Sequence, residues 1–167
     1  MDADAKKTGL RMIPYGLYVL TARNAKGEIA AATVNWVTQT SFEPPLVAIG
    51  LKPDSGSYAA LKESGKFSLN MLGKGQKSMA YAFFKPVEVQ EDRIQGEPYV
   101  DGENGAPLLE NAMAAVECSV SSIIEQGDHH IVIGEVTQAH VNTQPDGRPD
   151  ESILVMKELG DNVFYGG

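Results

Sequence analysis

Two long extended runs on either side of a short turn constrain the fold of this chain more than any other feature. The run AMAAVECSVSSIIEQ at 112–126 and the run HHIVIGEVTQAHV at 129–141 both alternate apolar with polar residues. Gly127 and Asp128 stand between them, and such residues are typical of hairpin turns. We therefore predict an antiparallel β-hairpin whose inward side chains lie in the core.

The other apolar segments are short and are separated by glycine, proline and asparagine residues. Segments rich in branched and aromatic residues predict strands at 15–24, 28–42, 46–52 and 66–72, with short closing strands at 153–158 and 162–167. Many strands at short spacing, with a few brief helices, predict a mainly β fold. The expected architecture is a closed or nearly closed β-barrel.

Two helices and one long loop are expected between these strands. Residues 55–66 predict a helix that Ser57 caps at its N-terminus and that Gly65 ends. Residues 75–85 place apolar side chains at helical spacing, which predicts a second helix packed on the barrel. Residues 86–107 contain several glycines and prolines and predict a loop.

Length and charge narrow the organisation and the partners. A chain of 167 residues suits a single domain over 1–167 that folds without a disulfide. A net charge of −8 argues against a nucleic acid or an anionic membrane as the main partner. No window is apolar enough to span a membrane and no leader-like segment opens the chain, so the expected location is cytoplasmic.

Cysteine and histidine residues give no sign of a metal centre. Cys118 lies in a run typical of a buried strand, so we expect a core thiol. His129 and His130 are adjacent and would point to opposite faces of a strand, which disfavours a shared metal ion. No nucleophile and base stand in a pattern typical of hydrolytic catalysis.

The segment TVNWVTQTS, residues 33–41, carries more hydrogen-bonding groups than a core strand needs. Asn35 offers a donor and an acceptor that could read the edge of a heterocycle, and Thr40 and Ser41 add hydroxyl groups. Polar groups beside apolar walls suit a planar cofactor. The alternative is an exposed strand whose threonines are present for their β-propensity.

A second candidate segment, LKPDSGSYAAL at 51–61, opens the first predicted helix. Four of its polar side chains gather around the turn: Lys52, Ser55, Ser57 and Tyr58. A helix N-terminus with free N–H and hydroxyl groups suits a phosphate. An ordinary N-cap at Ser57 explains the same pattern equally well.

Two more residues are weaker candidates. His129 follows the hairpin turn, and a plain turn with a surface histidine accounts for it as simply as a binding role does. Lys85 ends the second predicted helix, where a cation is favourable in any case because it faces the negative end of the helix dipole.

Taken in order, a series of segments resembles the flavin reductase-like family. The segments are YGLYVLTAR, TVNWVTQTSFEPPLVAIGL, SYAALKESGKFSLNML, GAPLLENAMAAVECSV and GDHHIVIGEV, and the similarity runs from about residue 12 to residue 140. The first segment is similar to the branch of flavoredoxins and of the flavin module of high-molecular-weight rubredoxins. The GDH turn is similar to that of two-component monooxygenase reductases. The resemblance implies the FMN-binding split barrel, a split β-barrel with a few short helices.

The resemblance also implies a homodimer that binds FMN, or less often FAD, near the dimer interface. Members move electrons from NADH or NADPH to flavin, as hydride passed from the nicotinamide C4 to the flavin N5. The reduced flavin then serves a separate acceptor or redox partner. The implied cofactor-binding residues are Thr33, Val34, Asn35, Trp36, Thr40, Ser41, Leu51, Lys52, Ser55, Ser57, Tyr58 and Lys85. His129 would lie on the nicotinamide side, and no protein acid or base is implied because the flavin carries the chemistry.

The chain departs from the family pattern at two positions. Many relatives have an arginine where this chain has Gly56, and an arginine could pair with phosphate through two parallel hydrogen bonds. Lys52 or Lys85 could supply a point charge instead. Trp36 stands where relatives often have serine, and it could stack on the flavin ring, shield one of its faces or pack at the dimer seam.

Three functions stay open from the sequence. The first is an NAD(P)H-dependent flavin reductase. The second is a flavoredoxin-like electron carrier without its own NAD(P)H site, which predicts tight FMN binding and negligible NAD(P)H oxidation. The third is a flavin-free split barrel that serves as a binding module, which predicts colourless protein after FMN addition. NADH and NADPH are not distinguished, because the chain has no dinucleotide fingerprint.

Overall fold

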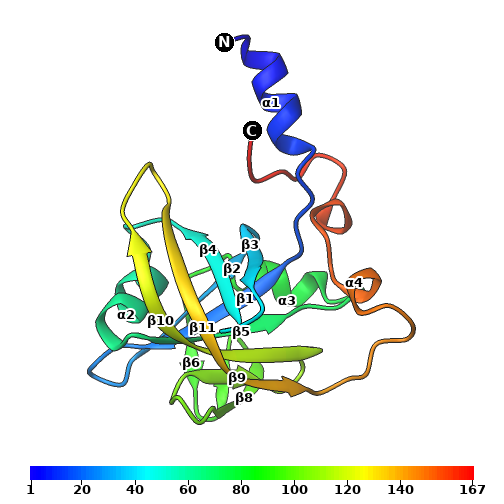
Figure 1. The fold of residues 1–167 in the computed structure, drawn as a ribbon. Helices are drawn as coiled ribbons and strands as arrows, with labels where there is room; N and C mark the ends of the chain where they lie inside the picture. Colours follow the sequence, from blue (N-terminus) through cyan, green and yellow to red (C-terminus); the bar gives the residue numbers. More distant parts are fainter.

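The predicted hairpin forms the centre of the fold. In the computed structural model, which covers residues 1–167, β10 (Ala114–Ile124) pairs antiparallel with β11 (His130–Val141). Register shifts after Glu117 and after Val120 mark two irregularities, and such bulges bend a strand pair and increase its twist. The bend lets this long hairpin wrap around the core instead of lying flat (Figure 1).

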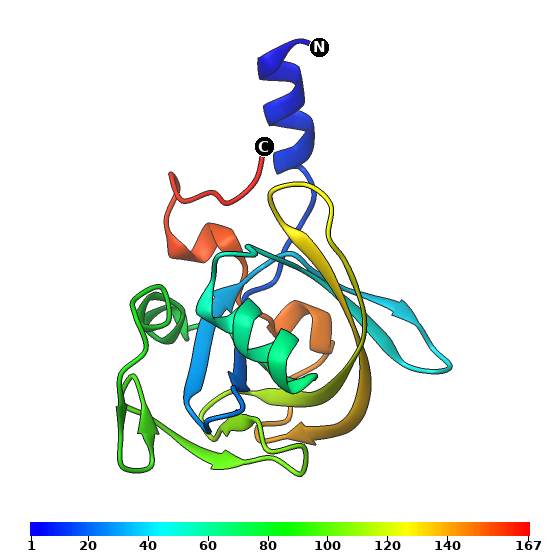
Figure 2. The same cartoon turned by 90° about the vertical axis from the view of Figure 1, so that its left-hand side faces the viewer.

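Shorter strands extend the hairpin on both sides into one antiparallel sheet. Its strand order is β2-β1-β5-β10-β11-β4-β3, with β1 at Tyr18–Arg23, β2 at Ile29–Val34, β3 at Val37–Ser41, β4 at Leu46–Leu51 and β5 at Lys66–Met71. The sheet curls, and helix α2 (Gly56–Ser64) packs against β1, β2 and β5 on its concave side (Figure 2). The predicted mainly β fold, a split barrel with a few short helices, is confirmed.

The predicted strand at 28–42 is in fact two strands. The amide of Val37 donates to the carbonyl of Asn35 at 3.0 Å, a turn of three residues that ends β2 and redirects the chain into β3. The amide of Gly50 then donates to the carbonyl of Trp36 at 2.9 Å, which fixes the turn against β4. Because of this turn, the two strands lie at opposite edges of the sheet.

The inside of the barrel is one apolar cluster. Phe67 and Leu61 are among its fully buried side chains, and Cys118 lies beside them with no exposed surface. Burial raises the pKa of the Cys118 thiol to about 12, so the thiol stays protonated at neutral pH. The prediction of a core thiol is confirmed.

A second apolar cluster lies between the barrel wall, helix α3 (Lys77–Ala82) and the segment around Leu154. The predicted loop at 86–107 contributes to it through Ile94 and contains short strands, so that prediction is wrong. These strands are β6 (Val89–Gln90), β7 (Arg93–Ile94), β8 (Glu97–Asp101) and β9 (Pro107–Leu109), and they form a separate sheet in that order. Strands of two or three residues leave no periodic pattern for a sequence to show.

Both ends of the chain differ from expectation. Helix α1 (Ala3–Arg11) was not predicted; Asp2 caps it by accepting from the Ala5 amide at 2.7 Å, and it buries none of its residues. It projects from the barrel and runs beside the C-terminal tail (Figure 1). No helix of the structure combines the length and the apolar character needed to cross a membrane.

The predicted closing strands at 153–158 and 162–167 are wrong. Between helix α4 (Pro149–Ser152) and the 3₁₀ helix η1 (Met156–Leu159), Ile153 and Val155 each form a single bridge to the barrel, and η1 occupies most of the rest of 153–158. Residues 160–167 form no strand or helix. Their apolar side chains cover a pocket instead of pairing with a strand.

Candidate functional site

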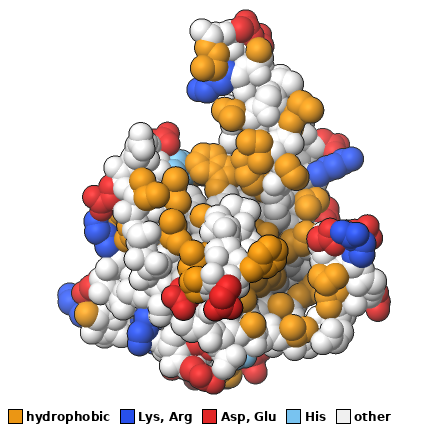
Figure 3. Space-filling model, in the orientation of Figure 1, with side chains coloured by type: hydrophobic (Ala, Val, Ile, Leu, Met, Phe, Trp, Pro, Cys, Tyr) orange, Lys and Arg blue, Asp and Glu red, His pale blue; other side chains and the backbone are white.

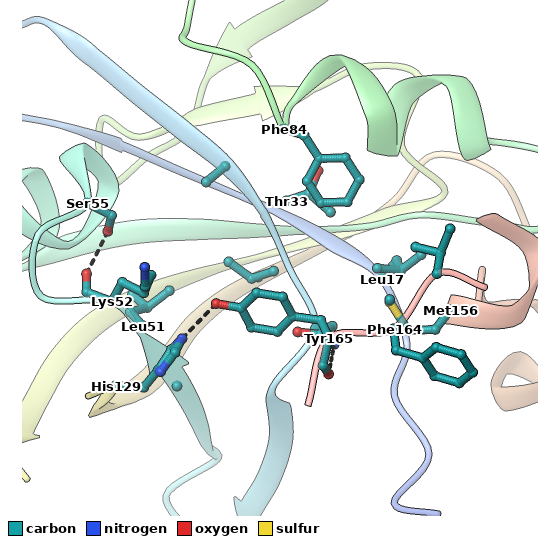
Figure 4. Close-up of a pocket in the computed structure, with 15 residues that line it drawn as sticks. Leu17, Thr33, Leu51, Lys52, Ser55, Phe84, His129, Met156, Phe164 and Tyr165 are labelled. Carbon is teal, nitrogen blue, oxygen red and sulfur yellow. Dashed lines mark hydrogen bonds between the residues drawn. The ribbon is translucent and has the colours of Figure 1, made fainter. Parts of the chain in front are cut away.

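A pocket of about 340 Å³ opens where β2, β4, α2 and the C-terminal tail meet (Figure 4). Its walls are mostly apolar, with a few polar groups placed among them. The apolar side chains are Leu17, Ala32, Val34, Leu51, Phe84, Met156, Val163 and Phe164. The polar ones are Thr33, Asn35, Lys52, Ser55, His129 and Tyr165, with Gly50 completing the lining. This composition is typical of a site for a largely apolar ligand with a few polar substituents.

The turn at the end of β2 supplies Asn35. Its side chain is buried, and its amide nitrogen donates to the Tyr165 carbonyl at 3.3 Å, a long hydrogen bond. Two residues before Asn35, Thr33 donates its hydroxyl to the Ala80 carbonyl at 2.7 Å. Thr33 therefore anchors α3, whereas Asn35 keeps a carboxamide oxygen for which the structure shows no partner.

The N-terminus of α2 supplies the cationic end of the pocket. Ser55, not the predicted Ser57, is the N-cap: its hydroxyl accepts from the Tyr58 amide at 3.2 Å and donates to the Lys52 carbonyl at 2.8 Å. Gly65 ends the helix in the left-handed region at φ 69°, as predicted. Lys52 is the only lysine or arginine in the pocket lining, and the first N–H groups of a helix add partial positive charge beside it.

Next to Lys52, at the tip of the β10–β11 hairpin, the pocket holds an aromatic cluster around His129 (Figure 4). Its Nδ1 lies 2.9 Å from the Asp128 carboxylate. Its Nε2 lies 2.7 Å from the Tyr165 hydroxyl, the contact drawn as a dashed line in Figure 4. When Nδ1–H donates to Asp128 in the neutral imidazole, Nε2 accepts from Tyr165. The bond from His129 lowers the pKa of Asp128, so this carboxylate stays ionised and holds the ring orientation. The Trp36 ring packs on His129 with centroids 4.5 Å apart.

Comparison with known proteins assigns this arrangement to a family. The family model described as "Flavin reductase like domain" matches residues 10–158. This chain belongs to that family. The assignment confirms the family and the fold predicted from the sequence, and it places the chain among flavin-reducing oxidoreductases at the level of the family.

Individual relatives agree with the family model. A "Flavin reductase" of Pseudomonas putida is 33% identical over 81% of this chain and 78% of its own length. A "Probable flavin reductase" of Rhizobium meliloti (strain 1021) is 38% identical over 81% of this chain, and the chain spans 43% of that protein. The solved NADH:FAD oxidoreductase SgcE6 of Streptomyces globisporus C-1027 is 32% identical, with a TM-score of 0.67 over 77% of this chain and 76% of its own.

The pocket of this flavin reductase-like chain includes part of the predicted binding set. Seven of the residues predicted from the sequence line it: Thr33, Val34, Asn35, Leu51, Lys52, Ser55 and His129. They come from β2, from the link between β4 and α2 and from the hairpin tip. These segments are far apart in sequence but meet because β4 pairs with β11.

Three of the predicted residues lie away from the pocket lining for reasons of topology. Thr40 and Ser41 stand at the far end of β3, an edge strand that leads away from the pocket. Lys85 follows α3 with its side chain exposed and is not among the lining residues. Contacts of these three residues with flavin stay predictions.

Ser57, Tyr58 and Trp36 also lie outside the lining, because each is packed into the protein. Ser57 and Tyr58 are buried on the barrel side of α2, and the Tyr58 hydroxyl lies 2.7 Å from Nδ1 of His130. His130 therefore faces α2 while His129 faces the pocket, as expected for neighbours in a strand. Trp36 packs over Gly50, where a β-carbon would come within 3.0 Å of the indole.

The sequence did not indicate the wall formed by the C-terminal tail. Met156, Val163, Phe164 and Tyr165 line the pocket, together with Phe84 beyond α3. One signal was present: two aromatic residues stand next to Gly166 and Gly167 in a segment too short to form a strand pair. Such residues need an apolar surface to cover, and here the surface is the pocket.

Proposed function

We propose that this chain is an NAD(P)H-dependent flavin reductase that binds FMN in the pocket between β2, the start of α2 and residues 163–165. The observation that carries the proposal is the polarity of that pocket. Apolar walls that suit a flavin ring meet a lysine at a helix N-terminus, which suits a phosphate, and the oriented His129 beside that lysine, which suits a nicotinamide.

The residues of the pocket fit a flavin mononucleotide. The apolar side chains of Val34 and Leu51 would flank the isoalloxazine ring, and the free carboxamide oxygen of Asn35 would accept from a ring N–H group. Lys52 and the N–H groups that open α2 would hold the phosphate. The predicted roles of Thr40, Ser41 and Lys85 are not part of this proposal.

The bound flavin would supply the redox chemistry by accepting hydride at N5 from the nicotinamide C4 of NAD(P)H. The chain supplies position and polarity. Its apolar walls would exclude water from a bound flavin, and the Lys52 charge would favour an anionic ligand. Asp128 holds His129 in one orientation, so that the imidazole can contact the nicotinamide carboxamide.

The choice of nucleotides is part of the proposal. FMN is the proposed flavin. FAD is the alternative to test, because the related SgcE6 is described as an NADH:FAD oxidoreductase. That description also names NADH, so NADH is the first electron donor to test. A separate acceptor or redox protein would receive the electrons.

A homodimer is proposed from an apolar groove where the core-bearing face of the sheet reaches the surface, beside the apolar cluster inside the barrel. Tyr18, Val47, Met71 and Val136 are among the residues that line this groove of about 280 Å³. Figure 3 shows hydrophobic side chains gathered over the middle of that face, with few charges among them. Burial of such a surface against a second copy would remove apolar area from water.

One observation favours the electron carrier as a second candidate. The Tyr165 ring lies beside His129, in the region proposed for the nicotinamide (Figure 4). A site closed permanently in this way would bind flavin and accept electrons from a protein partner only.

An anaerobic absorbance titration separates these functions. Purified protein is mixed with FMN, freed of excess flavin, and treated first with NADH and then with NADPH. Bleaching of the flavin band at about 450 nm supports the reductase. Bound flavin that does not bleach supports the carrier, and colourless protein after removal of excess FMN contradicts both.

A further inference from the structure

Residues 163–165 form a wall between two cavities. On one side lies the proposed flavin pocket of about 340 Å³, and on the other lies a cavity of about 500 Å³ next to the C-terminal end of α1. Met156, Val163, Phe164 and Tyr165 line both cavities. Displacement of this segment toward α1 would enlarge the pocket without moving the barrel.

Few contacts hold the segment over the pocket. Tyr165 is 45% exposed, and its contacts are the hydrogen bond from its hydroxyl to His129, the long bond from Asn35 to its carbonyl, and ring contacts with Trp36 and His129 at centroid distances of 5.4 and 5.8 Å. On the other side Arg11 lies 4.3 Å from the centroid of the Phe164 ring and donates to the Gly166 carbonyl at 3.3 Å. A segment without strand pairing and with few buried contacts belongs to the least stable parts of a fold.

The closed position also leaves a buried donor without a partner. Nε1 of Trp36 is buried and makes no hydrogen bond, and Gly166 of the tail lies next to it. A buried N–H group without an acceptor costs free energy. Movement of the tail would expose this N–H group to water, which partly offsets the loss of the Tyr165 hydrogen bond.

We propose that Tyr165 gates the nicotinamide position of this site. In the closed state its ring occupies the space beside His129, and it must swing toward the second cavity before NAD(P)H can stack on flavin. The inference rests on the proposed reductase function. It adds a residue that controls the KM for the pyridine nucleotide and has a smaller effect on the affinity for flavin. A binding-competent state that is only partly populated weakens apparent affinity by that fraction.

The first test needs neither flavin nor turnover, because Trp36 is the only tryptophan of the chain. Quenching of its fluorescence by acrylamide reports how far the tail shields the indole. We expect the quenching constant of Tyr165→Ala to rise at least about twofold over the parent protein, since the indole would no longer be covered. Tyr165→Phe, which removes only the hydroxyl, should give an intermediate value, and Tyr99→Phe in β8 serves as the matched control.

The second test compares kinetic constants with binding constants. We expect Tyr165→Ala to lower the KM for NADH by about fivefold or more, because the closed state no longer competes. The dissociation constant for FMN, from flavin fluorescence, should change by a smaller factor. Tyr165→Phe should raise the quenching constant and lower the KM for NADH, each by less than Tyr165→Ala does. Its melting temperature should match that of the parent protein.

The outcomes separate the gate from the function on which it rests. Unchanged quenching in both variants, or a KM for NADH that stays the same or rises in Tyr165→Ala, overturns the gate while flavin reduction stands. If NADH does not bleach FMN bound to the parent protein but does bleach FMN bound to Tyr165→Ala, the gate is supported and closes more firmly than proposed. If neither bleaches, the reductase function and the gate both fail.

Discussion

Glu117 is buried in a polar cluster in which Asn104 and His140 both donate to its carboxylate. At the pocket rim, by contrast, several polar groups have no protein partner. The Glu117 side chain is 1% exposed and accepts from the Asn104 amide at 2.6 Å and from Nε2 of His140 at 2.8 Å. Lys52 at the rim takes part in none of the ion pairs of the structure. The difference indicates that the polar groups around Glu117 stabilise the fold, whereas those at the pocket rim are available to bind a ligand.

Glu117→Ala should produce the largest effect in this comparison. The substitution leaves the Asn104 amide and the His140 imidazole without their acceptor, so we expect the free energy of unfolding to fall by about 3 kcal/mol. Urea denaturation would measure it. Glu125→Ala is the matched control, because Glu125 pairs with Lys62 at the exposed surface, and its loss should cost less than about 1 kcal/mol. Equal losses in the two variants would contradict the distinction.

The pH dependence of stability should also come from the cluster. Burial alone would raise the pKa of Glu117, but the hydrogen bonds from Asn104 and His140 outweigh it and lower the pKa below its ordinary value. A group with a lowered folded pKa contributes stability above its unfolded pKa of about 4.3 and loses it as pH falls through the folded value. The difference in unfolding free energy between the parent protein and Glu117→Ala should therefore shrink below about pH 4. A constant difference from pH 7 to pH 3 would argue against an ionised Glu117.

At the rim, His129→Ala should raise the KM for the pyridine nucleotide by about tenfold and alter flavin affinity less, because the imidazole is proposed to contact the nicotinamide. His130→Ala is a matched control, since this neighbour faces Tyr58 instead of the pocket. Both substitutions are best compared in the Tyr165→Phe background, where the hydrogen bond to His129 is already absent. If neither kinetic constant moves, the GDH turn is structural.

Asn35→Ala should weaken FMN binding by about fivefold, the loss expected for one hydrogen bond to a ring edge. Flavin fluorescence titration measures the affinity. Asn24→Ala offers a control, because this asparagine belongs to the turn after β1 and bonds to Glu28. Unchanged affinity in Asn35→Ala would remove Asn35 from the binding set.

The parts of the molecule that the sequence predicted are those fixed by local patterns. Alternation over 112–141 predicted the β10–β11 hairpin, and the glycine at 65 predicted the end of α2, because a left-handed residue there favours glycine. The N-cap was misplaced because Ser55 and Ser57 are chemically equivalent caps two residues apart. The fold decides between them, because the Ser55 hydroxyl accepts from the Tyr58 amide and donates to the Lys52 carbonyl, whereas Ser57 is buried in the first turn of α2.

The parts that the sequence missed depend on long-range contacts. Asn35 and Trp36 continue the pattern of an extended strand, and the turn between them is stabilised by β4 through Gly50. The tail forms no strand, and its place over the pocket depends on contacts with Asn35, Trp36 and His129, which lie far from it in the sequence. The sequence thus identified the polar residues of the pocket, but the apolar wall that Phe164 and Tyr165 add came from the structure.

Lys52→Gln should produce the smallest effect and sharpen the comparison most. An exposed lysine that meets a phosphate contributes modestly, so FMN affinity should fall by about threefold, and the loss should shrink further at high salt. Riboflavin, which lacks the phosphate, should bind Lys52→Gln and the parent protein equally well. Lys62→Gln is the control, because Lys62 lies in the last turn of α2 and pairs with Glu125. If riboflavin affinity falls in parallel with FMN affinity, Lys52 contacts the isoalloxazine ring or stabilises the pocket. In that case the N–H groups of α2 alone must hold the phosphate.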